Sequence, residues 1–237
     1  MISQTYPAWD KTVVLVTYGR SGSTLVQNLL NALPGALVRG ENENLLAPLA
    51  RAWDILRASQ QRADMLINER VTGPHHPWYG FEAALPESFG ADLALAFARS
   101  LLRPARDTRI AGFKEIRWHN DPALFPVMLD FLRAFFPGVR IVFNLRDHAA
   151  VCRSGWWKTM PPEAVRRSLQ EAEALYAAYA ARHPGACLTL HYERYVTGPA
   201  AWRPLFAFLD EPYDADLVQR ALDRRLTHLK EWKPGTP

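Results

Sequence analysis

Apolar positions in this chain fall into short runs rich in β-branched residues, separated by longer stretches in which apolar and polar positions repeat with a helical period. The short runs predict strands and the longer stretches predict helices. The predicted strands span 13–16, 35–39, 109–114, 139–145 and 186–191. Helices are predicted over 25–33 and 122–136, between the fourth strand and residue 182, and between the fifth strand and residue 226. Strands separated by helices indicate an α/β fold with a mostly parallel sheet flanked by helices on both faces.

The stretch 44–105 interrupts this alternation. Its pattern is mostly helical, with breaks at 72–77, where Gly and Pro gather, and at Pro86. Because it lies between two predicted strands, we expect it to be a cap-like insertion over an acceptor site. The 237 residues are 49% hydrophobic, which is enough for one sizeable core, and no stretch has the composition of a linker. We therefore predict a single domain over 1–237.

The first strand leads into a loop of small residues and then into a helix. Two glycines give the loop backbone freedom, and the first N–H groups of the following helix face an anion. The loop reads Tyr18-Gly19-Arg20-Ser21-Gly22-Ser23-Thr24. This arrangement predicts a phosphate site, although an ordinary strand-to-helix turn with incidental serines is the alternative. An ATP-type loop would need a Lys after its last glycine, and this chain has Ser23 there.

A second candidate anion site follows the strand 139–145. Parallel strands open at the same edge of the sheet, so Arg146 is expected beside the first loop. Its guanidinium offers a planar fork of donors to a phosphate. Ser154 follows about two helical turns later, and Lys158 about one turn further on the same face. The alternatives are an ion pair of Arg146 with Asp147 and ordinary exposed helix positions for the other two residues.

These two motifs together resemble the sulfotransferases that use 3′-phosphoadenosine 5′-phosphosulfate (PAPS). The resemblance implies a P-loop-like three-layer fold, PAPS as donor and 3′-phosphoadenosine 5′-phosphate (PAP) as product. It implies 5′-phosphosulfate binding by the loop 18–24 and 3′-phosphate binding by Arg146 and Ser154. The stretch 189–195 is similar to the family segment whose tyrosine, here Tyr192, lies against the nucleotide. Trp232-Lys233-Pro234 is similar to a nucleotide-contacting Lys-Pro of the tyrosylprotein branch, and Lys158 falls where that branch has an Arg.

The resemblance also implies an acidic general base next to a glycine after the second strand. Glu41, which follows Gly40, is the first candidate and Glu43 the second. The tyrosylprotein type has two adjacent acidic residues where this chain has Glu41 and then Asn42, which cannot take a proton. The alternative is that both carboxylates are charges at the start of the next helix, where they favour its dipole.

Lys114, at the end of the strand 109–114, lies where the family often has a catalytic Lys. The resemblance gives it the bridging oxygen of the donor as a partner, and Arg20 the sulfuryl oxygens. A salt bridge of Lys114 with Glu115 or Glu41 is the structural alternative. Ile116 stands where the cytosolic small-molecule sulfotransferases have a catalytic His, and His119 is three positions further. A histidine mechanism is therefore disfavoured.

Composition narrows the remaining choices. The net charge of +4 comes from scattered Arg, without a basic face that carries aromatics, so no nucleic-acid partner is expected. Cys152 and Cys187 have neither disulfide nor metal spacing, and no metal is expected. No apolar stretch approaches the roughly 18 residues of a membrane span, and residues 1–10 do not resemble a leader. We therefore expect a cytoplasmic protein, and the sequence does not indicate an oligomeric state.

The acceptor hydroxyl could belong to a small molecule, a sugar or a peptide. Aromatic residues such as Trp53, Trp78 and Trp156 either line an acceptor pocket or pack in the core, and His75 and His76 fall in a loop that we expect to face solvent. Two other functions fit a phosphate loop: a nucleoside-triphosphate-dependent small-molecule kinase, which would need Mg²⁺, and a nucleotide-binding protein without turnover.

Overall fold

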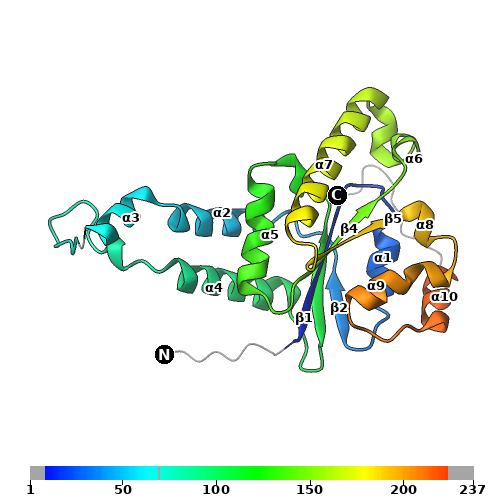
Figure 1. The fold of residues 1–237 in the computed structure, drawn as a ribbon, viewed down its shortest axis with the longest axis horizontal. Helices are drawn as coiled ribbons and strands as arrows, with labels where there is room; N and C mark the ends of the chain where they lie inside the picture. Colours follow the sequence, from blue (N-terminus) through cyan, green and yellow to red (C-terminus); the bar gives the residue numbers. More distant parts are fainter. Residues whose placement is uncertain (1–8, 69, 224–237) are drawn as a thin grey trace, which may run out of the picture.

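The computed structural model of the protein describes residues 9–68 and 70–223. Its centre is a five-stranded sheet in the order β2-β3-β1-β4-β5, in which every neighbouring pair is parallel (Figure 1). The strands are β1 (Lys11–Thr17), β2 (Ala36–Arg39), β3 (Ile110–Glu115), β4 (Arg140–Leu145) and β5 (Cys187–His191). The predicted α/β fold is confirmed, and all five predicted strands are present. In such sheets ligands bind at the carboxyl ends of the strands, where the strand order reverses.

Helices cover both faces of this sheet. They are α1 (Ser23–Leu30), α5 (Leu124–Phe135), α6 (His148–Cys152), α7 (Pro162–Arg182), α8 (Tyr192–Tyr195), α9 (Arg203–Phe208) and α10 (Ala215–Asp223). Alternate residues of β1 point to opposite layers. Val14 and Val16 pack in the core that includes α5 and α7, whereas Val13 and Leu15 pack in the core that includes α1, α9 and α10. This arrangement explains why β1 is a continuous buried run rather than an alternating one.

The predicted insertion forms a helical arm. It consists of α2 (Leu46–Arg57), α3 (Gln60–Ile67), the short helix η1 (Phe81–Ala83), α4 (Pro86–Phe97) and the π-helix η2 (Ala98–Leu102). Trp53 of α2 packs against two Phe rings of α5 with centroid distances of 5.7 and 5.4 Å, which fixes the base of the arm. From there the arm extends sideways, past α5 and away from the sheet (Figure 1). Its role as a cap stays a prediction.

The segment after β4 differs from its prediction. One helix was expected to carry both Ser154 and Lys158, but α6 already ends at Cys152. Ser154 has extended backbone angles, and Gly155 has a φ of +57°. This turn starts the 3₁₀ helix η4 (Gly155–Thr159), which carries Lys158.

Two further 3₁₀ helices, η3 (Trp118–Asn120) and η5 (Pro199–Trp202), connect the larger elements. Among the described helices, none is long and apolar enough to cross a membrane.

Candidate active site

A cavity of about 620 Å³ lies at the carboxyl ends of the strands. It is lined by residues from the β1–α1 loop, the segment after β2, the end of β3, the segments after β4 and α8. Ten of the residues predicted from the sequence line it: Gly19, Arg20, Gly22, Ser23, Thr24, Glu41, Lys114, Arg146, Ser154 and Tyr192. Folding therefore brings both predicted anion-binding motifs, the candidate base and the candidate lysine to one cavity.

The β1–α1 loop leaves the start of α1 ready for an anion. Gly22 is the residue before α1 and has a left-handed φ of 84°. No side chain caps this helix start, and its first turn contains no acidic residue, so its N–H groups and dipole are available to a negative ligand. A Cβ on Gly22 would lie 2.3 Å from the Tyr192 ring, and one on Gly19 would lie 2.2 Å from the Trp156 ring. Both glycines are thus required by close packing of aromatic rings on the loop.

Ser21 has a different position from its neighbours. Its side chain is buried, and its hydroxyl lies 2.8 Å from the hydroxyl of Thr17. The Asn144 side chain of β4 donates to the Ser21 carbonyl at 3.0 Å. These contacts fasten the loop to the sheet, and Ser21 is absent from the described cavity lining.

Two arginines face the cavity. Arg20 Nε donates to Ser154 Oγ at 2.9 Å, and Arg146 Nη1 donates to the Arg20 carbonyl at 3.0 Å. The Arg146 guanidinium stacks over the Tyr192 ring, 4.3 Å from its centroid. Its buried Nε has no hydrogen-bond partner within residues 9–68 and 70–223. The alternative ion pair with Asp147 is not formed, because Asp147 caps α6 with its side chain. Arg146 is thus held in place while part of its fork remains available.

A partly buried hydrogen-bond network lies behind Arg146. The Tyr18 hydroxyl accepts from the Arg146 backbone N–H at 2.9 Å and donates to Glu173 Oε1 at 2.8 Å. His148 Nε2 lies 2.9 Å from the same carboxylate oxygen. Burial raises the pKa of Tyr18 well above its ordinary value, so this hydroxyl stays protonated and can donate. The network fixes the backbone from which the Arg146 side chain reaches the cavity.

Glu41 and Lys114 form an ion pair inside the cavity, with 3.0 Å between Oε1 and Nζ. The Lys114 side chain is 10% exposed and that of Glu41 is 32% exposed. Glu43 differs from Glu41, because its side chain is 87% exposed and lies 3.5 Å from Arg117. The pairing of Lys114 with Glu41, one of the two predicted structural alternatives, is therefore present, and it lies within the cavity that the β1–α1 loop also lines.

Glu115 shapes the loop that carries Glu41. Its carboxylate is fully buried at the end of β3 and accepts from the backbone N–H of Asn44 at 3.1 Å and of Ile116 at 2.8 Å. Asn44 and Glu43 have positive φ angles of 60° and 57°. Buried carboxylates need such partners. Glu115 thus holds the segment after β2 in a turn that directs Glu41 to the cavity.

Other predicted residues lie elsewhere. Lys158 is exposed in η4 and is not among the lining residues, and Lys233 falls outside the described residues. His119 lies near the Tyr176 hydroxyl, at 3.5 Å, and lines a separate cavity; burial lowers its pKa. His75 and His76 are exposed in the arm. Trp53, Trp118 and Trp157 are core residues, whereas Trp156 lines the cavity.

Gln27 and Ile116 also line the cavity, and the sequence analysis did not identify them as functional. The sequence does contain a signal that Gln27 belongs to the site, since Gln27 follows Ser23 by one helical turn and shares its helix face. Its amide donates to the Val38 carbonyl of β2 at 3.2 Å. Ile116 had none beyond its place two residues after Lys114.

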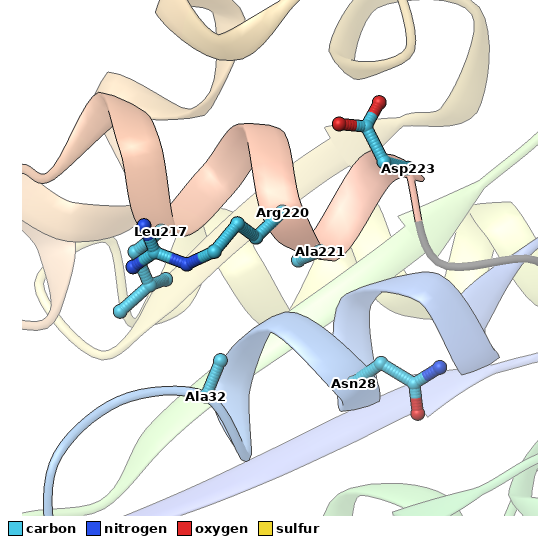
Figure 2. A pocket seen from close by; sticks show the side chains of 6 residues that line it. All are labelled: Asn28, Ala32, Leu217, Arg220, Ala221 and Asp223. Atoms are coloured by element: carbon cyan, nitrogen blue, oxygen red, sulfur yellow. The ribbon is translucent and has the colours of Figure 1, made fainter.

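A further cavity, of about 530 Å³, lies between α1 and α10. Figure 2 shows its lining, with Asn28 from α1, Ala32 from the turn after α1, and Leu217, Arg220, Ala221 and Asp223 from α10. It shares no lining residue with the cavity at the strand ends. Among the described residues, no group of three or more His, Cys, Asp or Glu side chains is placed to hold a metal ion.

The protein has a P-loop-like α/β fold, in which the β1–α1 loop lies in the cavity at the carboxyl edge of the sheet. A family model described as the sulfotransferase family matches residues 13–215. The chain therefore belongs to the sulfotransferase family.

Solved structures agree with this fold. The chain is similar to the sulfotransferase domain of the Synechococcus PCC 7002 olefin synthase, with 18% identity, a TM-score of 0.59, and coverage of 96% of this chain and 85% of that one. The sulfotransferase domain from the curacin biosynthetic pathway shows 15% identity and a TM-score of 0.51, with coverage of 92% and 80%. A comparison with curated protein sequences finds no match.

Proposed function

We propose that the protein transfers a sulfuryl group from PAPS to the hydroxyl of an acceptor, with Glu41 as general base. The observation that carries this proposal is the Glu41–Lys114 pair in the same cavity as the phosphate loop and Arg146. Binding groups and a proton acceptor must lie together for such a reaction. Membership in the sulfotransferase family supports the reaction type.

The cavity fits a ligand that carries two separate anionic groups. The uncapped start of α1, with Gly22, is suited to the 5′-phosphosulfate. The Arg146 guanidinium and the Ser154 hydroxyl, which both line the cavity, are suited to the 3′-phosphate. The Tyr192 ring, stacked on Arg146, offers an aromatic surface to the nucleotide. Lys158 and Lys233 complete the proposed set of nucleotide contacts.

PAPS supplies an activated sulfuryl group with PAP as its leaving group. Glu41 takes the proton of the acceptor hydroxyl as the acceptor oxygen bonds to sulfur. Lys114 donates a hydrogen bond to the bridging oxygen, whose bond to sulfur breaks. Arg20 and the N–H groups of the loop stabilise the sulfuryl oxygens. Catalysis thus depends on position and electrostatics, as it does in phosphoryl transfer.

Calorimetry tests the donor assignment. PAP should bind without a divalent ion, and more tightly than ATP with Mg²⁺. Transfer from PAPS should then persist in EDTA. Tighter binding of ATP with Mg²⁺, together with activity that requires Mg²⁺, would favour a kinase instead. PAP binding without transfer to any hydroxyl compound would favour a nucleotide-binding protein without turnover.

A further inference from the structure

Another cavity, of about 380 Å³, lies on the other side of Glu41. We call it the second cavity, and the one that the β1–α1 loop lines is the first. Among the residues that line it, Glu41 is the one that also lines the cavity with the phosphate loop. The candidate base therefore stands where the two cavities meet. A molecule in the second cavity can present a hydroxyl to Glu41 without displacing a ligand from the first.

The walls of this second cavity differ in chemistry. One wall is the polar segment 39–43 that follows β2. The other lining residues form an apolar wall: Leu45 before α2, Leu101 and Leu102 of the π-helix η2, and Phe113 of β3. The cavity is thus amphipathic, with the candidate base among its polar lining residues and a hydrocarbon surface formed by the others.

The apolar wall is held in place by an unusual turn. The Arg103 N–H donates to the Ala98 carbonyl five residues earlier at 2.8 Å, which makes η2 a π-helix. Such turns are rare and occur often at functional sites. The Leu102 carbonyl, left free by the end of the helix, accepts from Arg39 Nε at 3.0 Å. Arg39 ends β2, so this bond ties the leucine wall to the strand that leads to Glu41.

We infer that this second cavity binds the carbon skeleton of the acceptor, and that the acceptor is a small alcohol with an apolar aliphatic or aromatic body. This inference rests on the proposed function. A sugar would bring several hydroxyl groups against the leucine wall, where they would lack partners. A volume near the lower end of the roughly 300–1,000 Å³ of small-molecule sites favours a small acceptor over a peptide.

The test compares 1-butanol, 1-hexanol and glucose as acceptors with PAPS. Each methylene buried on the leucine wall is worth about fourfold in affinity, so kcat/KM should be about fifteenfold higher for 1-hexanol than for 1-butanol. Glucose should be the poorest of the three. Equal values for the two alkanols, or a preference for glucose, would overturn the inference.

Two matched variants locate the effect. Leu45 and Leu66 are exposed to 46% and 48%, and only Leu45 is near Glu41. Leu45→Trp should narrow the cavity and lower kcat/KM for 1-hexanol at least about tenfold, with PAP affinity kept. Leu66→Trp on α3 should leave both unchanged. Equal losses in the two variants would contradict the assignment.

Direct binding separates this inference from the proposed function. Ligand-observed NMR can follow 1-hexanol on the protein without donor, and Leu45→Trp should weaken that signal. If PAP fails to bind while 1-hexanol binds and responds to Leu45→Trp, the proposed donor is wrong and the cavity assignment stands. If PAP binds and glucose is sulfated while 1-hexanol shows no binding, the cavity assignment is wrong and the proposed function stands.

Discussion

Both ends of the sheet carry Lys and Arg side chains, but the partners of these side chains differ between the two ends. Three neighbouring strands begin at or next to a cation and end at or near one. Lys11 is the first residue of β1 and Arg20 follows its end, Arg109 precedes β3 and Lys114 lies near its end, and Arg140 is the first residue of β4 and Arg146 follows its end. At the amino ends, every one of these cations is paired with a carboxylate. At the carboxyl ends, within the part of the chain that the structure describes, only Lys114 is paired with a carboxylate.

One short segment after α9 supplies the partners at the amino ends. Glu211 lies 3.2 Å from Lys11 and 2.9 Å from Arg109, and Asp210 lies 3.1 Å from Arg140. At the other end, Arg20 contacts a hydroxyl and Arg146 a carbonyl. Neutral partners orient a cation without neutralising it. The amino ends are therefore closed by structural ion pairs, whereas the carboxyl ends keep positive charge for an anionic ligand.

The largest expected effect concerns Glu41, the one carboxylate among the described residues that line the cavity at the strand ends. Glu41→Gln keeps the shape of the side chain and removes its basicity, so turnover should fall at least about a hundredfold. PAP affinity should change little. Steady-state transfer and calorimetry measure the two quantities. Glu43→Gln should cost far less, because that side chain points to solvent; an inactive Glu43→Gln beside an active Glu41→Gln would move the base to Glu43.

A sharper contrast comes from the arginines at the two ends of β4, Arg140 as its first residue and Arg146 directly after its last. Arg146→Ala removes charge-assisted hydrogen bonds worth roughly 1.5–3 kcal/mol, so PAP should bind at least about tenfold more weakly. Adenosine 5′-monophosphate, which lacks the 3′ group, should be affected much less. Arg140→Ala, at the other end of the same strand, should lower the melting temperature and leave PAP affinity unchanged. Equal losses for both nucleotides in Arg146→Ala would contradict a 3′-phosphate contact.

Acid should weaken the ion pairs that Glu211 forms at the amino ends of the strands. Arg109 and then Lys11 hold the pKa of Glu211 below its ordinary value. The unfolded carboxyl therefore takes up a proton at higher pH than the folded one. The resulting stabilisation is complete above the usual glutamate pKa of about 4.3 and is lost as pH falls through the lower folded value.

Glu211→Gln should accordingly lower the free energy of unfolding by about 1–2 kcal/mol at pH 7, a range reduced by the exposure of Arg109. Urea unfolding at pH 7 and at pH 3 measures it. The difference between the parent protein and the variant should shrink at pH 3. A constant difference would show that the charge of Glu211 is not what stabilises this end.

The smallest effect is expected for a change at Tyr18, which lies behind Arg146. Tyr18→Phe removes the hydroxyl that holds the Arg146 backbone, and a hydrogen bond of about 1 kcal/mol corresponds to roughly fivefold in PAP affinity. Tyr179→Phe is a matched control, because this buried hydroxyl donates to Asp130 at 2.8 Å in α5. It should leave PAP affinity unchanged. A loss of the same size in both variants would reduce the role of Tyr18 to general stability.

The sequence by itself determined the five strands and the alternation of strands with helices. Local signals were sufficient for this, because β-branched runs mark strands and glycines with serines mark the turn into α1. Parallel strands then place their carboxyl ends at one edge of the sheet, so Gly22, Lys114 and Arg146 are predicted to lie close together. The helix after β4 was predicted too long because a turn at Gly155 interrupts a stretch that has helical spacing.

Only the tertiary structure decided which side chains face the cavity. Ser21 turns inward because Asn144, 123 residues away, binds its carbonyl, whereas Ser23 lines the cavity. Glu41 and Glu43 diverge because Glu115, 71 residues from Asn44, holds the loop between β2 and α2. The sideways course of the arm likewise depends on Trp53 packing against α5. These contacts join residues distant in sequence, and no local pattern of hydrophobic and polar positions encodes them.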